Sequence, residues 1–139
     1  MKKSRTRGST NITQKVAAER KARLVAFVKS LPGADAIASD DHLSLEVGKK
    51  RFGWYLFDHH GDGRLAINCK APLGVAQRLV KSAPERFHIP KFLGHLGWVG
   101  MWLDTPQIDW TEVDAILLGA YRMTASRKLI AEFEVKNRS

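Results

Sequence analysis

Apolar residues recur at every second position between residues 43 and 69, and this alternation constrains the fold more than any other feature of the chain. A period of two is typical of β-strands with one buried face, because successive side chains on a strand point to opposite sides. The alternating residues form three groups: Leu43, Leu45 and Val47; Phe52, Trp54 and Leu56; and Leu65, Ile67 and Cys69. We therefore predict three consecutive strands whose apolar sides face one core.

Two short loops set the expected register of these strands. A two-residue loop at Gly48-Lys49 would pair Leu45 with Phe52, so that both apolar sets lie on the same side of a hairpin. A loop of four residues, 59–62, would carry the same register into the third strand. The three strands are thus expected to form an antiparallel meander.

An amphipathic helix is predicted before the strands, over residues 13–30. Asn11 and Gln14 have the spacing of a capping box, and Pro32-Gly33 stops the helix. Apolar residues at spacings of three, four and seven form its buried stripe: Val16, Ala17, Leu24, Phe27, Val28 and Leu31.

Shorter elements follow the meander. A helix is expected to open at Ala71-Pro72 and to close at Pro84, because proline suits the first turn of a helix and stops a later one. Residues 86–90 are expected to be extended. Residues 97–103 are apolar on both faces and are predicted as a strand.

The C-terminal part is predicted to be helical. Asp109 and Glu112 have capping-box spacing at the start of a helix. Gly119 lies inside this helix, where glycine is unfavourable, so we expect it to pack closely against the sheet. Further helical turns are expected around residues 129–133.

These elements predict a two-layer α+β domain, in which an antiparallel sheet packs against N- and C-terminal helices. A chain of 139 residues fits one domain. We assign residues 13–139 to that domain and residues 1–12 to a flexible basic arm.

The positive charge is concentrated at the N-terminus. The formal net charge is +9, of which residues 1–29 contribute +8 and residues 30–139 contribute +1. Such a basic segment favours a polyanionic partner such as nucleic acid. A solvated tail without a binding role explains the same charge, and both interpretations stay open.

Several short motifs occur together in the second half of the chain: Pro90, Gly97-Trp98-Val99, Leu103-Asp104, Asp109-Trp110 and Ala120-Tyr121-Arg122. Together with the upstream run at residues 47–53 and the turn Gly61-Asp62-Gly63, they resemble the pattern of the MmcQ/YjbR-like family. This resemblance implies a frataxin-like (CyaY-like) α+β fold, also described as a double wing. Members are commonly labelled DNA-binding by structural analogy, and the resemblance brings no catalytic residues with it.

Basic side chains at two places are candidates for nucleic-acid contacts. Lys49, Lys50 and Arg51 lie at the tip of the first predicted hairpin, where a wing could lay cations along phosphates. The arm adds Lys2, Lys3, Arg5 and Arg7, which suit sequence-independent contacts. Charged hairpin tips also protect sheets against edge pairing, and this alternative stays open.

Aromatic residues suggest a second candidate surface. Tyr55 and Phe57 are expected on the second face of the meander, and the last strand adds Trp98 and Trp102. Such a face could stack unpaired bases, line a small-molecule pocket or form a dimer interface. Burial under another segment of the chain is the alternative.

Catalytic and metal chemistry find no support in the sequence. Asp58, His60 and Asp62 have the spacing of a calcium loop, but Cys69 stands where the bidentate glutamate belongs. Cys69 is the single cysteine and is expected to be a core thiol. We therefore expect no enzyme activity, no metal and no cofactor, unless a pocket gathers His88, His95 or Cys69.

The location expected for the protein is the cytoplasm. No apolar run approaches the roughly 18 residues of a membrane-spanning helix, and no membrane partner is expected. The first hypothesis is a non-catalytic protein that binds DNA or another nucleic acid through its phosphates. The second is a module that binds a small ligand or a protein partner through the aromatic face. The oligomeric state stays open.

Overall fold

The computed structural model describes residues 12–58, 61–91 and 93–137. Its six strands form one antiparallel sheet, in the order β2-β3-β4-β5-β7-β6. The strands are β2 (Ala34–Ser39), β3 (His42–Val47), β4 (Lys50–Phe57), β5 (Leu65–Cys69), β6 (Phe87–His88) and β7 (Val99–Trp102). The helices are α1 (Gln14–Ser30), α2 (Val75–Ser82), α3 (Trp110–Thr124) and α4 (Arg127–Lys136), with a short 3-10 turn at Gly94–Leu96.

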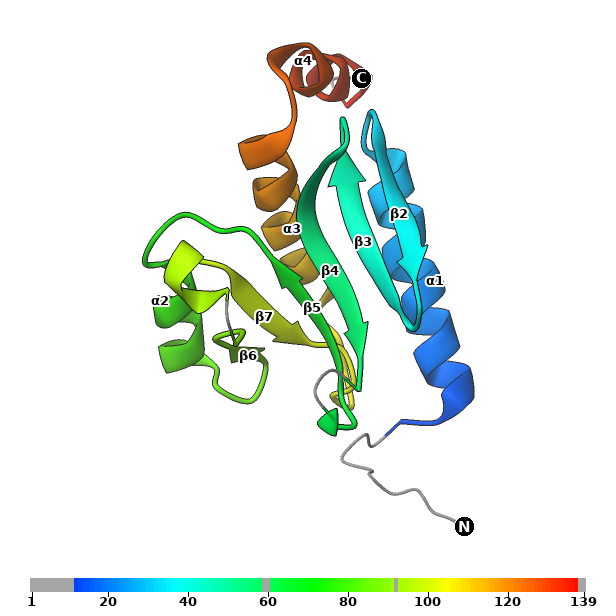
Figure 1. Cartoon of the computed structure of the whole chain (residues 1–139), viewed down its shortest axis with the longest axis vertical. Helices are drawn as coiled ribbons and strands as arrows, with labels where there is room; N and C mark the ends of the chain where they lie inside the picture. Colours follow the sequence, from blue (N-terminus) through cyan, green and yellow to red (C-terminus); the bar gives the residue numbers. More distant parts are fainter. Residues whose placement is uncertain (1–11, 59–60, 92, 138–139) are drawn as a thin grey trace.

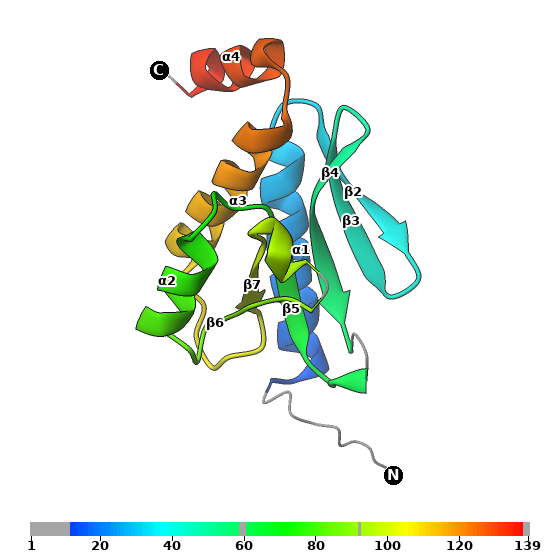
Figure 2. The ribbon, with the colours of Figure 1, turned by 60° about the vertical axis from the view of Figure 1, so that its left-hand side comes forward.

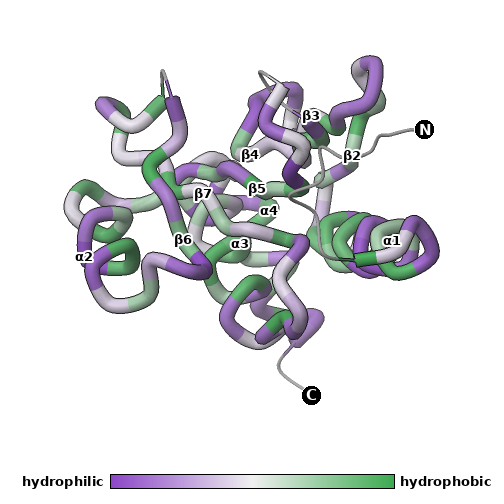
Figure 3. Tube along the Cα trace, turned by 90° about the horizontal axis from the view of Figure 1, so that it is seen from below, coloured by the Kyte–Doolittle hydropathy of each residue, from purple (hydrophilic) through white to green (hydrophobic). Residues whose placement is uncertain are grey.

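Helices cover one face of the sheet, which confirms the predicted α+β class (Figure 1). Helix α1 packs on β2, and α3 packs on β4 and β5. Figure 3 shows α1 and α3 on the same side of the sheet. The core between these layers includes Leu24 of α1, Ile67 of β5 and Tyr121 of α3. The Tyr121 hydroxyl donates a hydrogen bond to the Pro32 carbonyl at 2.7 Å.

The predicted hairpin turn is confirmed. Val47 pairs with Lys50 across a two-residue loop. Gly48 and Lys49 both have positive φ angles, 56° and 68°, as a type I′ turn requires.

The predicted register is wrong beyond this turn, because β4 carries one extra residue. Glu46 pairs with Arg51 and Leu45 pairs with Gly53, so Phe52 is the bulged residue between them. The slip moves every later side chain of β4 to the other face. Tyr55 therefore takes the core position expected for its neighbours, and Trp54 and Leu56 lie on the opposite face.

Gly53 explains why the bulge lies here. It occupies a core-facing position beside Leu45, where a Cβ atom would lie 2.9 Å from the Asn68 carbonyl oxygen. The strands approach too closely for a larger residue. Phe52 instead packs into the core, with its ring edge-to-face with Tyr121 at 6.1 Å.

Three smaller expectations are corrected. Strand β2 was not predicted, because its sequence of small residues has no strong alternation, and it is largely exposed. Thr13 caps α1 by accepting from the Val16 amide, while Asn11 lies outside the described residues. Gly119 has no atom within 4 Å of where its Cβ would be, so close packing does not explain it.

Helix α3 begins where the sequence predicts, whereas α4 is longer than the turn or two expected around residues 129–133. The Asp109 side chain accepts a hydrogen bond from the Glu112 amide at 3.1 Å, which confirms the cap of α3. The Glu112 carboxylate does not complete a capping box, because it binds Arg86 at 3.0 Å instead. Ser126 caps α4 by accepting from the Leu129 amide.

Candidate functional site

The four aromatic residues predicted to share a face do not share one. Tyr55 belongs to the core and is 4% exposed, because the bulge in β4 reverses its direction. Trp98 is also buried, whereas Phe57 is exposed at the end of β4. Trp102 is half-buried on the face of the sheet away from α1 and α3. The predicted aromatic surface is therefore wrong, and a different set of residues gathers around Trp102.

The Arg64–Asp104 ion pair, whose carboxylate is buried, lies against Trp102. The Arg64 guanidinium makes a bidentate contact with Asp104, with Nε 2.9 Å from Oδ2 and Nη2 2.8 Å from Oδ1. Asp104 is 1% exposed and also accepts from the Leu65 amide at 3.0 Å. These bonds hold the guanidinium plane in one orientation at the start of β5.

Trp102 lies between two stacked groups. The Arg64 guanidinium carbon is 3.8 Å from the centre of the indole ring. The His88 ring centre is 3.9 Å away, at an interplanar angle of 23°. Two groups cannot both come this close on one side, so they take opposite faces of the indole. Neither face of Trp102 is left for a nucleic-acid base to stack on.

Gly100 makes room for His88. The two residues are paired in β7 and β6, and the imidazole lies across the glycine. A Cβ atom at Gly100 would collide with the His88 ring. A glycine in the middle of a strand is explained here by the close approach of a side chain.

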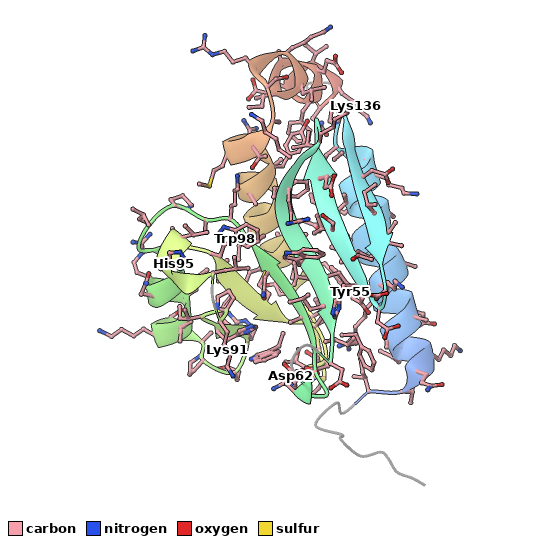
Figure 4. The ribbon with its side chains drawn as sticks, in the orientation of Figure 1. Tyr55, Asp62, Lys91, His95, Trp98 and Lys136 are labelled. Atoms are coloured by element: carbon pink, nitrogen blue, oxygen red, sulfur yellow. The ribbon has the colours of Figure 1, made fainter. Side chains whose placement is uncertain are left out.

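A pocket of about 210 Å³ opens beside this stack. Its floor is the sheet face formed by β4 and β5, and its wall is the chain segment after β6. The lining residues are Leu56, Asp62, Arg64, Ala66, Asn68, His88, Ile89, Pro90, Lys91 and Trp102. Figure 4 shows Lys91 and Asp62 near one another at one end of the molecule, away from Lys136.

Two buried polar atoms in this lining have no hydrogen-bond partner among the described residues. They are Asn68 Oδ1 and His88 Nδ1. Asn68 is 5% exposed and lies in the middle of β5, where it pairs with Trp54 on one side and Gly100 on the other. Buried polar groups are nearly always hydrogen-bonded, so two exceptions in one pocket require an explanation.

A second hollow of about 190 Å³ adjoins the first and shares Leu56, Asn68 and Lys91 with it. Trp54 lies in its lining. The Arg51 guanidinium carbon is 4.2 Å from the centre of the Trp54 ring. The bulge in β4 thus places a tryptophan in this groove instead of in the core.

The predicted nucleic-acid residues fall at separate places. Lys49 and Lys50 are exposed at the β3–β4 turn. Arg51 is engaged on the sheet face, where its Nε donates to Ser44 Oγ at 2.8 Å. Lys2, Lys3, Arg5 and Arg7 lie outside the described residues. The β3–β4 turn lies near α4, whereas α1 begins at the opposite end of the molecule (Figure 2).

Other chemistry predicted from the sequence is placed as follows. Cys69 is fully buried in the core, as expected, and burial raises the pKa of its thiol to about 12. The Asp58 carboxylate closes its own loop by accepting from the Gly63 amide at 2.6 Å. In the described part of the chain, no three His, Cys, Asp or Glu side chains are arranged to hold a metal ion. His88 lies in the pocket, whereas His95 is exposed outside its lining.

The pKa of His88 predicts how stability depends on pH. Burial, and to a smaller extent the nearby Arg64 charge, lower this pKa from 6.5 to about 4. Lys91 and Asp62 are the other charged residues in the same lining. The unfolded chain then binds a proton between pH 6.5 and 4 that the folded chain refuses.

The free energy of unfolding is therefore expected to fall as the pH falls through this window, by roughly 2 kcal/mol. This is less than the whole shift would give, because solvent reaches part of the ring. Denaturant unfolding of the full chain at several pH values measures the loss, and His95→Gln is the matched control. The same loss in a His88→Gln variant would assign the pH dependence to other groups.

Neither Asn68 nor the Arg64–Asp104 pair was selected from the sequence. Asn68 is a polar residue inside a predicted apolar strand, between Ile67 and Cys69, and this interruption was the available signal. Arg64 and Asp104 are 40 positions apart, so their contact depends on β5 and β7 being neighbours.

Comparisons with known proteins agree with this fold. A sequence profile of a protein family described as YjbR matches residues 29–123. Among solved structures, the chain is similar to the Deinococcus radiodurans protein DR2400, described as a DUF419 domain. The TM-score is 0.61 and the identity 19%, over 74% of this chain and 76% of that one. A search of curated proteins finds no match. Among the described residues, no helix is both long enough and apolar enough to cross a membrane.

Proposed function

The chain belongs to the YjbR family, and we propose that it is a non-catalytic binding protein of the cytoplasm whose small ligand occupies the pocket beside Trp102. This develops the second hypothesis from the sequence, with the binding face moved from the predicted aromatic set to Asn68, His88 and their neighbours.

The observation that carries the proposal is the pair of unpartnered atoms, Asn68 Oδ1 and His88 Nδ1. A buried polar group without a partner costs about 1–3 kcal/mol. An asparagine in the centre of β5 is therefore unfavourable for folding alone. A ligand that hydrogen-bonds to it would offset this cost, which is the usual arrangement at binding sites.

Cys69 and His88, two residues considered for catalysis, support binding more than catalysis. The Cys69 thiol faces the core, and its raised pKa of about 12 disfavours the reactive thiolate. The His88 ring is neutral near pH 7, and stacking on Trp102 fixes its position. Its unpartnered Nδ1 lacks, among the described residues, the carboxylate that orients a histidine base in catalytic triads.

A fragment screen tests this proposal. Small polar compounds are added to the isotope-labelled full chain, and the amide resonances are followed by NMR. The resonances that shift are expected to cluster at Asn68, His88 and Lys91. Hits that cluster elsewhere on the molecule, or an absence of hits, would contradict the proposal.

The Asn68→Leu variant adds a second readout. Because it removes a buried acceptor without a partner, it is expected to raise the free energy of unfolding by about 1 kcal/mol and to weaken the binding of fragments that donate a hydrogen bond to Asn68. Ser44→Ala is the matched control on the same sheet face. Ser44 Oγ is buried but bonded to both Arg51 and Glu46, so its loss is expected to destabilise the fold. Destabilisation by Asn68→Leu as well would show that Asn68 serves the fold.

Nucleic-acid binding is the second candidate, and the exposed β3–β4 turn favours it. The side chains of Lys49 and Lys50 are exposed and form no ion pair within the described part of the chain, so a hairpin wing could lay both along a phosphate backbone. The basic arm would add further contacts.

Fluorescence anisotropy with labelled duplex DNA over a salt series tests this candidate. The double variant Lys49→Glu, Lys50→Glu is expected to reduce the slope of log K against log salt by about 2. The control is Arg78→Glu, Lys81→Glu, which makes the same charge change on α2. Equal slopes for the two double variants would remove the hairpin from the binding surface. A variant without residues 1–10 measures the contribution of the arm.

A further inference from the structure

Lys91 places a positive charge at the entrance to both hollows. It lines the 210 Å³ pocket and the adjoining 190 Å³ hollow, and its side chain is exposed. Within the described part of the chain, no acidic side chain forms a salt bridge with it. Its ammonium group is therefore available to an anion that enters from solvent.

Arg64 is the second basic residue of the lining, and its guanidinium is already paired with the Asp104 carboxylate. This leaves Lys91 as the basic residue of the described lining that forms no salt bridge. Asp62 is the one acidic residue in the lining, and its Oδ1 accepts a hydrogen bond from the Arg64 amide at 2.8 Å.

The floor of the pocket requires a different group. Asn68 Oδ1 is a hydrogen-bond acceptor and faces no donor in the described structure. An O–H or N–H group, from water or from a ligand, satisfies it. A ligand that displaces such a water keeps this hydrogen bond when it carries a donor at the end that reaches the sheet.

The remaining lining limits the size and polarity of the ligand. Leu56, Ala66 and Pro90 give the pocket apolar walls. Its volume of about 210 Å³ is below the roughly 300–1,000 Å³ of sites for drug-sized ligands. A single ring or a short branched chain fits such a space.

From these contacts we propose that the pocket binds a small organic anion, a carboxylate or a phosphate ester, that also carries a hydroxyl or amide N–H group. The anionic group pairs with Lys91 at the entrance, and the donor bonds to Asn68 Oδ1 at the floor. This inference rests on the proposed function, because it names the ligand class of the same pocket.

The test uses probes that differ by one group each. The carboxylate probes are the 3- and 4-hydroxybenzoates, the matched neutral probes are their methyl esters, and benzoate lacks the hydroxyl donor. The phosphate probe is 4-hydroxyphenyl phosphate. Affinities for the full chain are measured by NMR titration at near-neutral pH. A hydroxylated anion is expected to bind at least tenfold more tightly than its neutral ester and than benzoate.

Two variants connect each preference to its residue. Because Lys91 is exposed, the Lys91→Gln variant is expected to fold normally. It is expected to bind the acid and its methyl ester equally. Asn68→Leu is expected to remove the preference for hydroxybenzoate over benzoate. Whichever of the carboxylate and phosphate probes binds more tightly identifies the anionic group that the pocket prefers.

The outcomes separate this inference from the proposed function. If esters bind as tightly as the acids, or if Lys91→Gln leaves the preference unchanged, the anionic class is wrong. If other fragments shift the pocket resonances while none of these probes does, the ligand class is wrong and the binding function stands. If nothing shifts the pocket resonances, both proposals fail.

Discussion

Replacing Asp104 with alanine is expected to lower the free energy of unfolding by about 1–3 kcal/mol, measured by chemical denaturation of the full chain. The Asp104 side chain is fully buried and receives hydrogen bonds from both Arg64 and the Leu65 amide. Its removal leaves a guanidinium against the pocket floor without its partner, and an amide without its acceptor. Loss of the fixed guanidinium should also loosen the Trp102 stack.

Asp114→Ala is the control for this prediction. Asp114 pairs with Arg23 at 2.7 Å, but its carboxylate is 25% exposed, whereas the Asp104 carboxylate is fully buried. Ion pairs that solvent reaches contribute about 0–1 kcal/mol. A loss at Asp104 as small as the loss at Asp114 would show that the buried pair does not stabilise β5 against β7.

Replacing Gly100 with alanine is expected to destabilise the protein by about 1–3 kcal/mol, the usual cost of overpacking. The new Cβ would collide with the His88 ring, which must then leave the face of Trp102. A ring displaced into solvent loses the burial that lowers its pKa. The pKa of His88 should therefore rise from about 4 toward 6.5, as NMR titration of the imidazole protons would show.

The matched substitution is Gly119→Ala in α3. No atom lies within 4 Å of the added methyl group there, and alanine is the better helix former. This variant is expected to be more stable by about 0.5–1 kcal/mol. Opposite signs at the two glycines would separate the steric role of Gly100 from the general effect of glycine on stability. Unchanged stability and an unchanged His88 pKa in Gly100→Ala would contradict the prediction.

The strand pattern predicted the meander, but the one extra residue in β4, Phe52, decided that Trp54 and not Tyr55 lines the second hollow. Large apolar residues stand at both odd and even positions from Phe52 to Phe57, so alternation in β4 does not fix the register, and Gly53 is the sequence signal of a bulge. The bulge brings Gly53 close to the Asn68 carbonyl on the neighbouring strand. A contact between strands cannot be inferred from the periodicity of one strand. This is why Tyr55 was expected on the open face and Trp54 in the core.

The candidate site was less predictable than the fold. Its residues come from β4 and β5, from the segment around β6 and from the end of β7. Trp102 was predicted as part of an aromatic face and His88 as a residue that a pocket would make significant, whereas Asn68, Arg64 and Lys91 were not selected from the sequence. Asn68 became a candidate because of what it lacks in the folded chain, namely a hydrogen-bond partner within the described structure.

The sequence by itself determined the class of this protein: the order of the elements apart from β2, the β3–β4 turn, the cap at Asp109, the buried Cys69 and membership of the YjbR family. Local rules govern these features, because turns, caps and alternation depend on residues a few positions apart. Tertiary structure alone decided the sheet order, the slip at Phe52 and the stack of Arg64, Trp102 and His88. These depend on contacts between residues distant in the chain, and such contacts exist only once the strands have paired.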